Sequence, residues 1–122
     1  MMKELITILL LFVYITLSGQ MVPRDKQLHF YAGTEIGFAA SALAIEKKPL
    51  LSFGIAVGSA AFIGIAKELY DIKHGSPEVK DAAWTVIGGV AGYLIVQGFK
   101  FIGNNLEALI RKKTLPRLTW QK

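Results

Sequence analysis

The sequence predicts a small all-α protein, a helical transmembrane bundle of three spans that follow an N-terminal signal-like segment. The 122-residue chain is 52% hydrophobic and only 19% charged, which is more apolar than a typical soluble domain. Three separate stretches of 18 residues contain at most one charged residue each. Basic residues gather at the ends of these stretches, as is typical of membrane topology signals. Because the chain has no cysteine, disulfides, zinc-thiolate sites and a lipid-modified cysteine are excluded.

The N-terminus has the composition of a secretory signal peptide. Lys3 precedes an uncharged run at residues 5–17, and Ser18 and Gly19 supply small residues after it. The hydrophobic region of a signal peptide is about 7–15 residues long, whereas a spanning helix needs about 20. The length therefore favours cleavage near Gly19 over retention as a signal anchor. Both alternatives place the chain that follows on the outer side.

Three hydrophobic runs, residues 28–45, 49–66 and 82–99, are the predicted spans. At 1.5 Å per residue each run reaches about 27 Å, close to the roughly 30 Å hydrocarbon core. Pro49 follows a basic turn and suits the first turn of a helix. Glu35 alone interrupts the runs with a charge, and a carboxylate within a span is a functional candidate. We expect it to face Ser59 or Thr85 of a neighbouring helix, or to be protonated.

Each predicted span carries two glycines four residues apart, which is the small-xxx-small pattern of close helix packing in membranes. The pairs are Gly33 and Gly37, Gly54 and Gly58, and Gly88 and Gly92. We expect these faces to contact other helices, within the bundle, in a membrane-protein partner or in a second copy of the chain.

The orientation follows from the distribution of lysine and arginine. Nine lie on the side that contains Lys3, the turn at residues 46–48 and the C-terminal tail, and five lie on the other side. The positive-inside rule therefore places the tail inside. The tail carries Leu106, Leu109 and Ile110 beside basic residues, so we expect it to lie on the inner membrane surface, with a solvated tail as the alternative. The predicted organisation is residues 1–19 as signal peptide or anchor, 20–103 as the membrane domain and 104–122 as the basic cytoplasmic-side tail.

Three groups of polar residues lie at the outer ends of the three spans. Within each group the spacing of three or four residues places the side chains on one helix face. The sequence therefore predicts an outward-facing polar mouth that is the candidate ligand-binding site. Its members are Asp25, Lys26 and His29 in the first group, Lys67, Glu68 and Asp71 in the second, and Asp81 and Thr85 in the third.

This polar mouth has three interpretations. The lysines can pair with the carboxylates, which makes the group a salt-bridge network without a ligand. The histidine and carboxylates can hold a divalent cation. Alternatively, Lys26, Lys67 and His29 can hold the phosphate of an anionic headgroup. We predict no metal site, because a single histidine beside lysines disfavours zinc. We also predict no cofactor, and the pattern names no catalytic residue.

The ordered motifs resemble those of a family of small bacterial envelope proteins. The motifs are D-K-x-x-H-F at residues 25–30, K-E-x-x-D at 67–71 and D-x-x-x-T-x-x-G at 81–88. They are similar to the YfiM-like envelope lipoproteins and, more distantly, to the VanZ-like membrane proteins. The resemblance implies a membrane-embedded helical domain at the cell envelope and supplies no reaction. The chain departs from the lipoprotein pattern because no cysteine follows its hydrophobic N-terminal run.

Three functions are consistent with these features. The first is a bacterial envelope membrane protein, in the inner membrane with its polar mouth on the periplasmic side, that binds a lipid headgroup, a glycan precursor or a cation. The second is a structural or assembly subunit whose glycine faces contact larger membrane proteins. The third is a holin-like pore former. The lipid bilayer is the expected environment, and the positions of the basic residues do not indicate nucleic-acid binding.

Overall fold

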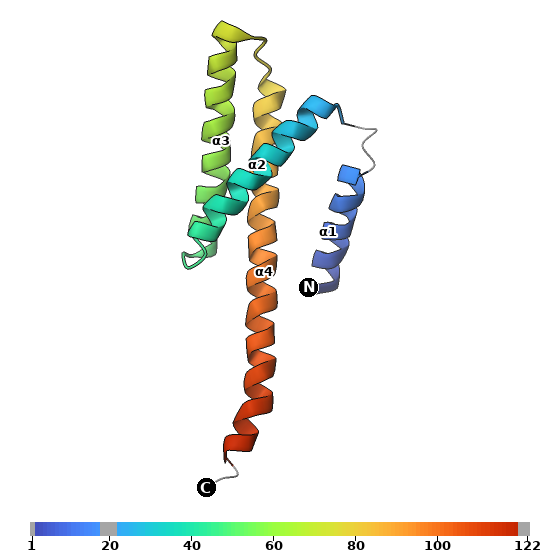
Figure 1. Ribbon diagram of the computed structural model, residues 1–122, viewed down its shortest axis with the longest axis vertical. Helices are drawn as coiled ribbons and strands as arrows, with labels where there is room; N and C mark the ends of the chain where they lie inside the picture. The colour runs from blue at the N-terminus through green and yellow to red at the C-terminus, as the bar shows by residue number, and fades with distance from the viewer. Residues whose placement is uncertain (1, 18–21, 120–122) are drawn as a thin grey trace.

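The computed structural model describes residues 2–17 and 22–119, and nearly all of them are helical (Figure 1). The four helices are α1 (Met2–Leu17), α2 (Arg24–Leu43), α3 (Pro49–His74) and α4 (Val79–Thr119). The described part of the chain contains no strand. The all-α prediction is therefore confirmed. The predicted cleavage site near Gly19 and the tail residue Trp120 lie outside the described residues.

Helices α2, α3 and α4 pack on one another, and α2 crosses the other two at an angle (Figure 1). The start of α2, the end of α3 and the start of α4 meet at one end of this bundle, as the topology of three successive antiparallel helices requires. At the opposite end, Lys100 Nζ of α4 donates to the carbonyl oxygen of Ile45 at 2.9 Å. A hydrogen bond between the buried hydroxyls of Ser41 and Ser52, 3.3 Å apart, joins α2 to α3.

The interface between α2 and α4 is built from glycine, which lets the two backbones touch. A Cβ atom on Gly33 would lie 2.9 Å from the Cα of Thr85, and one on Gly37 would lie 2.7 Å from the Cα of Gly89. From the other side, a Cβ on Gly88 would clash with the carbonyl oxygen of Phe30. Real side chains do not tolerate such distances, so the close contact predicted for the glycines of α2 and α4 is confirmed.

The third glycine pair contacts no other described helix of this chain, so its expected contact with a membrane-protein partner or a second copy stays a prediction. A Cβ on Gly54 or Gly58 would meet no atom within 4 Å. The buried face of α3 instead carries small residues on the other side of the helix, including Ala56 and Ala60, which are fully buried. The glycine face of α3 therefore points away from α2 and α4.

Within the described residues, two helices, rather than the three predicted, are long and apolar enough to cross a membrane. They are α3 and the segment Val79–Thr114 of α4. Helix α2 does not reach the same hydropathy, because it ends at Leu43 and carries His29, Thr34 and Glu35 among its glycines and alanines. Its predicted run at residues 28–45 also includes part of the turn before α3.

Helix α4 continues well past the bundle. The predicted boundary between residues 103 and 104 falls inside this helix, which has 41 residues and a length of about 60 Å at 1.5 Å per residue. Residues 102–114 are all exposed. The segment with Leu106, Leu109 and Ile110 is thus a straight continuation of α4 in this structure (Figure 1).

Helix α1 stands beside α4 (Figure 1). Aromatic and aliphatic side chains of α1 face the bundle. The rings of Phe12 and Phe30 lie 5.1 Å apart. Between α1 and α4 an apolar cavity of about 250 Å³ remains, lined by residues such as Leu9, Leu94 and Phe99.

Candidate functional site

The polar residues predicted to form an outward-facing mouth do gather at one end of the bundle, where α2 begins, α3 ends and α4 begins. We call this group the polar cluster. It consists of Asp25, Lys26 and His29 from α2, Lys67, Glu68 and Asp71 from α3, Glu78 from the connection before α4, and Asp81 and Thr85 from α4. All eight residues predicted from the sequence are therefore at this end, and Glu78 is an addition.

Lys26 occupies the centre of the polar cluster. Its Nζ forms ion-paired hydrogen bonds with Asp81 Oδ1 and Glu78 Oε2, and it lies 3.7 Å from Asp25 Oδ2. The lysine side chain is only 11% exposed and that of Asp81 only 7%. The hydrogen bonds to Asp81 and Glu78 raise the pKa of Lys26 well above its usual value. The lysine is therefore charged at neutral pH and is fully engaged by carboxylates.

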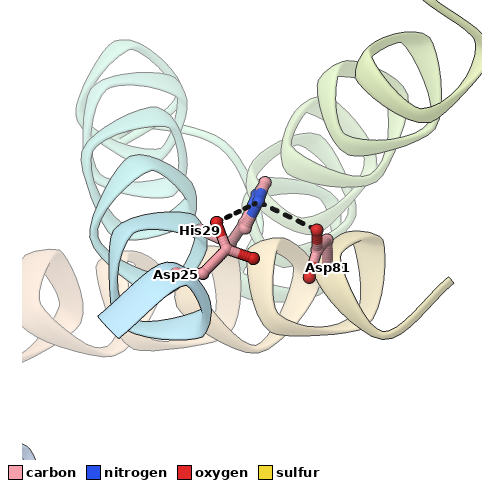
Figure 2. A group of neighbouring side chains, drawn as sticks. All are labelled: Asp25, His29 and Asp81. Atoms are coloured by element: carbon pink, nitrogen blue, oxygen red, sulfur yellow. Dashed lines mark ion pairs between the residues drawn. The ribbon is translucent and has the colours of Figure 1, made fainter. Parts of the chain in front are cut away.

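His29 lies between two carboxylates (Figure 2). Its Nε2 is 3.2 Å from Asp81 Oδ2 and 3.8 Å from Asp25 Oδ1. The spacing of four residues within α2 places Asp25 and His29 on one face, and the contact between α2 and α4 brings Asp81 opposite them. Because Lys26 holds Oδ1 of Asp81, the second oxygen of that carboxylate is left to face the imidazole.

The members from α3 form the second half of the polar cluster. Lys67 Nζ lies 2.6 Å from Asp71 Oδ2 and 3.7 Å from Glu68 Oε1. The backbone N–H of Glu78 donates to Glu68 Oε2 at 2.6 Å, which links α3 to the start of α4. Glu68 Oε1 is buried and accepts no hydrogen bond from any described residue. This half therefore carries a carboxylate oxygen whose negative charge is only weakly compensated.

Two polar side chains, Thr85 and Glu35, stand apart from the ion pairs. Thr85 is buried, but its hydroxyl donates to the carbonyl oxygen of Asp81 at 3.0 Å within α4, so its proton is used by the helix backbone. Glu35 was expected to face Ser59 or Thr85, or to be protonated. It is exposed and lies two turns away from the polar cluster along α2. Its side chain therefore lies outside the candidate site.

Glu78 is the member that sequence analysis did not select. It lies just before α4 and is three residues before Asp81, so one helical turn brings both carboxylates to Lys26. That spacing was available in the sequence. Glu78 directly follows Gly75, Ser76 and Pro77, which are typical of a connection between helices, so the sequence alone does not indicate that it joins the group at the helix ends.

The polar cluster has an excess of negative charge. It contains five carboxylates and two lysines, which gives a net charge of −3 when His29 is neutral. One ligand atom from each of Asp25, His29 and Asp81 lies within 4.8 Å of the other two. We predicted no metal site from the sequence, but the packing of α2 on α4 brings together donor atoms of types that bind divalent ions.

Comparisons with protein families, with curated proteins and with solved structures found no match to this chain. The polar cluster must therefore be interpreted from its own chemistry.

Proposed function

We propose that the protein is a small membrane protein of the bacterial envelope whose polar cluster binds a cation at the outer face of the membrane. The main observation is the excess of negative charge at this end of the bundle, where five carboxylates, three of them buried or partly buried and two of them exposed, surround only two lysines. A cation would neutralise the carboxylates that the two lysines leave unmatched. Buried charge without compensation is costly, so a bound cation would also stabilise the bundle.

An anionic headgroup is a weaker candidate. Lys26 is engaged by Asp81 and Glu78, and Lys67 is engaged by Asp71. A phosphate that entered the polar cluster would have to displace these carboxylates and would then lie next to them. The arrangement therefore favours a positively charged ligand over a lipid phosphate or a glycan precursor carried on a phosphate.

The packing supports a membrane location for α2 as well as for α3 and α4. The start of α2 contacts Asp81, and the turn that follows α2 contacts Lys100 of α4. These residues are 19 positions apart, or about 28 Å along a helix, close to the hydrocarbon thickness. We infer that α2 crosses the membrane beside α4 although its own hydropathy is low, because its glycine face is covered by α4. The positive-inside rule then places the polar cluster outside.

The resemblance to the YfiM-like and VanZ-like families is part of the same proposal. The residues that carry the resemblance at 25–30, 67–71 and 81–88 supply eight of the nine members of the polar cluster. A shared arrangement of polar helix ends would explain why these motifs occur in this order. A structure of a member of either family would test this point directly.

Isothermal titration of the purified full-length protein in detergent tests the proposed function. We expect binding of Mg²⁺, Mn²⁺ or Zn²⁺ and no binding of inorganic phosphate. Asp81→Asn should abolish the binding, because Asp81 is buried at the centre of the polar cluster. Asp71→Asn is the matched control, because Asp71 pairs with the half-exposed Lys67, and it should weaken binding only slightly. Binding of phosphate in place of cations would refute the proposal.

A second candidate function is supported by one observation, the open face of α3. Gly54 and Gly58 have space where the glycines of α2 and α4 have a packed helix. This face is available for a second copy or for another membrane protein, as expected for an assembly subunit. Replacing Gly54 and Gly58 by leucine should then convert an oligomer to a monomer in mild detergent. A protein that is monomeric before the change would exclude self-assembly through this face.

A further inference from the structure

We propose that Asp25, His29 and Asp81 bind a single divalent transition-metal ion, with Lys26 as a positioning residue for Asp81. This inference rests on the proposed function, since it names the class of cation that the polar cluster takes. It commits to ions that accept an imidazole nitrogen, such as Zn²⁺ and Mn²⁺, over ions that prefer oxygen alone.

The distances support three protein ligands and an open coordination position. Metal–ligand distances of about 2.0–2.2 Å place neighbouring ligand atoms of a tetrahedral site about 3.3–3.6 Å apart. The distance of 3.2 Å from His29 Nε2 to Asp81 Oδ2 is close to this range, and the distance of 3.8 Å to Asp25 Oδ1 has to shorten slightly. The Asp25 side chain is 65% exposed, so it can turn toward the other two ligands without disturbing the core. Solvent at Asp25 would supply the remaining ligand.

The local charge matches a divalent ion. Asp25, Asp81 and Glu78 contribute three negative charges, and Lys26 contributes one positive charge, so the immediate surroundings of a neutral His29 carry −2. A divalent ion would bring this group to neutrality, whereas a monovalent ion would not. Nearby, Glu68 Oε1 is buried without a hydrogen bond from any described residue and has only the more distant Lys67 Nζ, at 3.7 Å, as a positive neighbour.

Lys26 orients the ligand Asp81. Its bond to Asp81 Oδ1 fixes the carboxylate. The other oxygen, Oδ2, therefore faces His29, as Figure 2 shows. Hydrogen bonds that orient ligating carboxylates commonly change metal affinity by about 10- to 100-fold. The negative charge of Glu78 partly neutralises Lys26, which lowers the repulsion between Lys26 and a metal ion. The lysine thus positions a ligand and does not occupy the metal position.

The donor set selects among divalent ions. Imidazole suits zinc, iron and copper, and carboxylates suit magnesium, calcium and manganese. A site with one imidazole nitrogen and two carboxylate oxygens should bind Zn²⁺ and Mn²⁺ more tightly than Mg²⁺ or Ca²⁺. His29 is therefore the residue that separates a transition-metal site from a general acidic site for cations.

Titration of the full-length protein in detergent with Zn²⁺, and separately with Mg²⁺, tests the inference. His29→Gln keeps an amide that can bond to Asp81 and removes the imidazole, and it should weaken Zn²⁺ binding at least about tenfold while Mg²⁺ binding changes little. Asp25→Asn should also weaken Zn²⁺ binding about tenfold. Because the Asp25 side chain is exposed, this substitution should not disturb the fold, and a loss of binding would not be due to misfolding. His74→Gln and Glu46→Gln are matched controls, because both residues are exposed and lie outside the polar cluster.

The outcomes separate this inference from the proposed function. Equal affinity for Zn²⁺ and Mg²⁺, with no effect of His29→Gln or Asp25→Asn, would overturn the transition-metal site and leave cation binding intact. Absence of binding by every cation would overturn both. Loss of Zn²⁺ affinity in both variants, with unchanged binding in His74→Gln and Glu46→Gln, is the result that the geometry predicts. Cobalt offers a second readout, because the visible absorption of bound Co²⁺ should change when His29 is replaced.

Discussion

Replacing Gly33 by alanine should separate α2 from α4 and weaken cation binding at the same time. Alanine normally stabilises a helix interior by about 0.5–1 kcal/mol relative to glycine. At Gly33, however, the added Cβ would lie 2.7 Å from the carbonyl carbon of Thr85 and would clash with its oxygen. Overpacking of this kind costs about 1–3 kcal/mol, and here the obstacle is backbone rather than a flexible side chain. We therefore expect a net loss of about 2 kcal/mol in the free energy of unfolding.

Gly54→Ala is the matched control for this prediction. The same methyl group on α3 meets no atom within 4 Å, so only the gain in helix propensity should remain. Unfolding in detergent, followed by circular dichroism, measures both variants. Because Gly33 is one turn from His29, Gly33→Ala should also lower the affinity for cations. Equal stability of the two variants would show that the backbones of α2 and α4 do not touch, and would refute the packing described above.

Three further predictions concern the rest of the bundle. Ser41→Ala should lower the free energy of unfolding by about 1–2 kcal/mol, because it leaves the buried hydroxyl of Ser52 without its partner. The double variant Ser41→Ala, Ser52→Ala should recover most of this loss. Additive losses in the double variant would contradict the prediction. Lys67→Met should change the free energy of unfolding by no more than about 0.5 kcal/mol, because the Lys67 side chain in its pair with Asp71 is half exposed. A larger change would indicate that Lys67 belongs to the core. Removal of residues 104–122 should leave the thermal midpoint of the detergent-solubilised protein unchanged, because residues 104–114 are exposed; a lower midpoint would indicate a contact of this segment with the bundle.

The convergence of the polar helix ends could be predicted because it depends only on topology. Successive helices joined by short connections are antiparallel, so the start of α2, the end of α3 and the start of α4 must meet. The pairing of Lys26 and Lys67 with carboxylates also followed from the cost of isolated charge near hydrocarbon. Which carboxylates pair with Lys26 was less predictable. Lys26 pairs with Glu78 and Asp81 because the glycine contacts between α2 and α4 fix how α2 is rotated against α4.

The features that sequence reasoning missed depend on helix rotation and helix length. The spacing of two glycines does not determine whether their helix face is directed toward the bundle or away from it. The open face at Gly54 and Gly58 could therefore be recognised only from the packing of α3. Residues 104–115 contain no glycine or proline, so nothing in this stretch of the sequence ends α4 near residue 103. The near absence of charge in residues 28–45 also overestimated how apolar α2 is, because glycines, alanines and uncharged polar residues lower its hydropathy.

Paramagnetic broadening by Mn²⁺ tests the central claim most directly, because it reports where on the chain a cation binds. In nitrogen-15 spectra of the detergent-solubilised protein, substoichiometric Mn²⁺ should first broaden the amide signals of residues 25–29 and 78–85, and Asp81→Asn should remove the effect. The turn at residues 44–48, at the opposite end of the bundle, should be unaffected. Broadening centred on that turn or on the exposed end of α4, or no broadening at the polar cluster, would contradict the proposal that this cluster is a cation site.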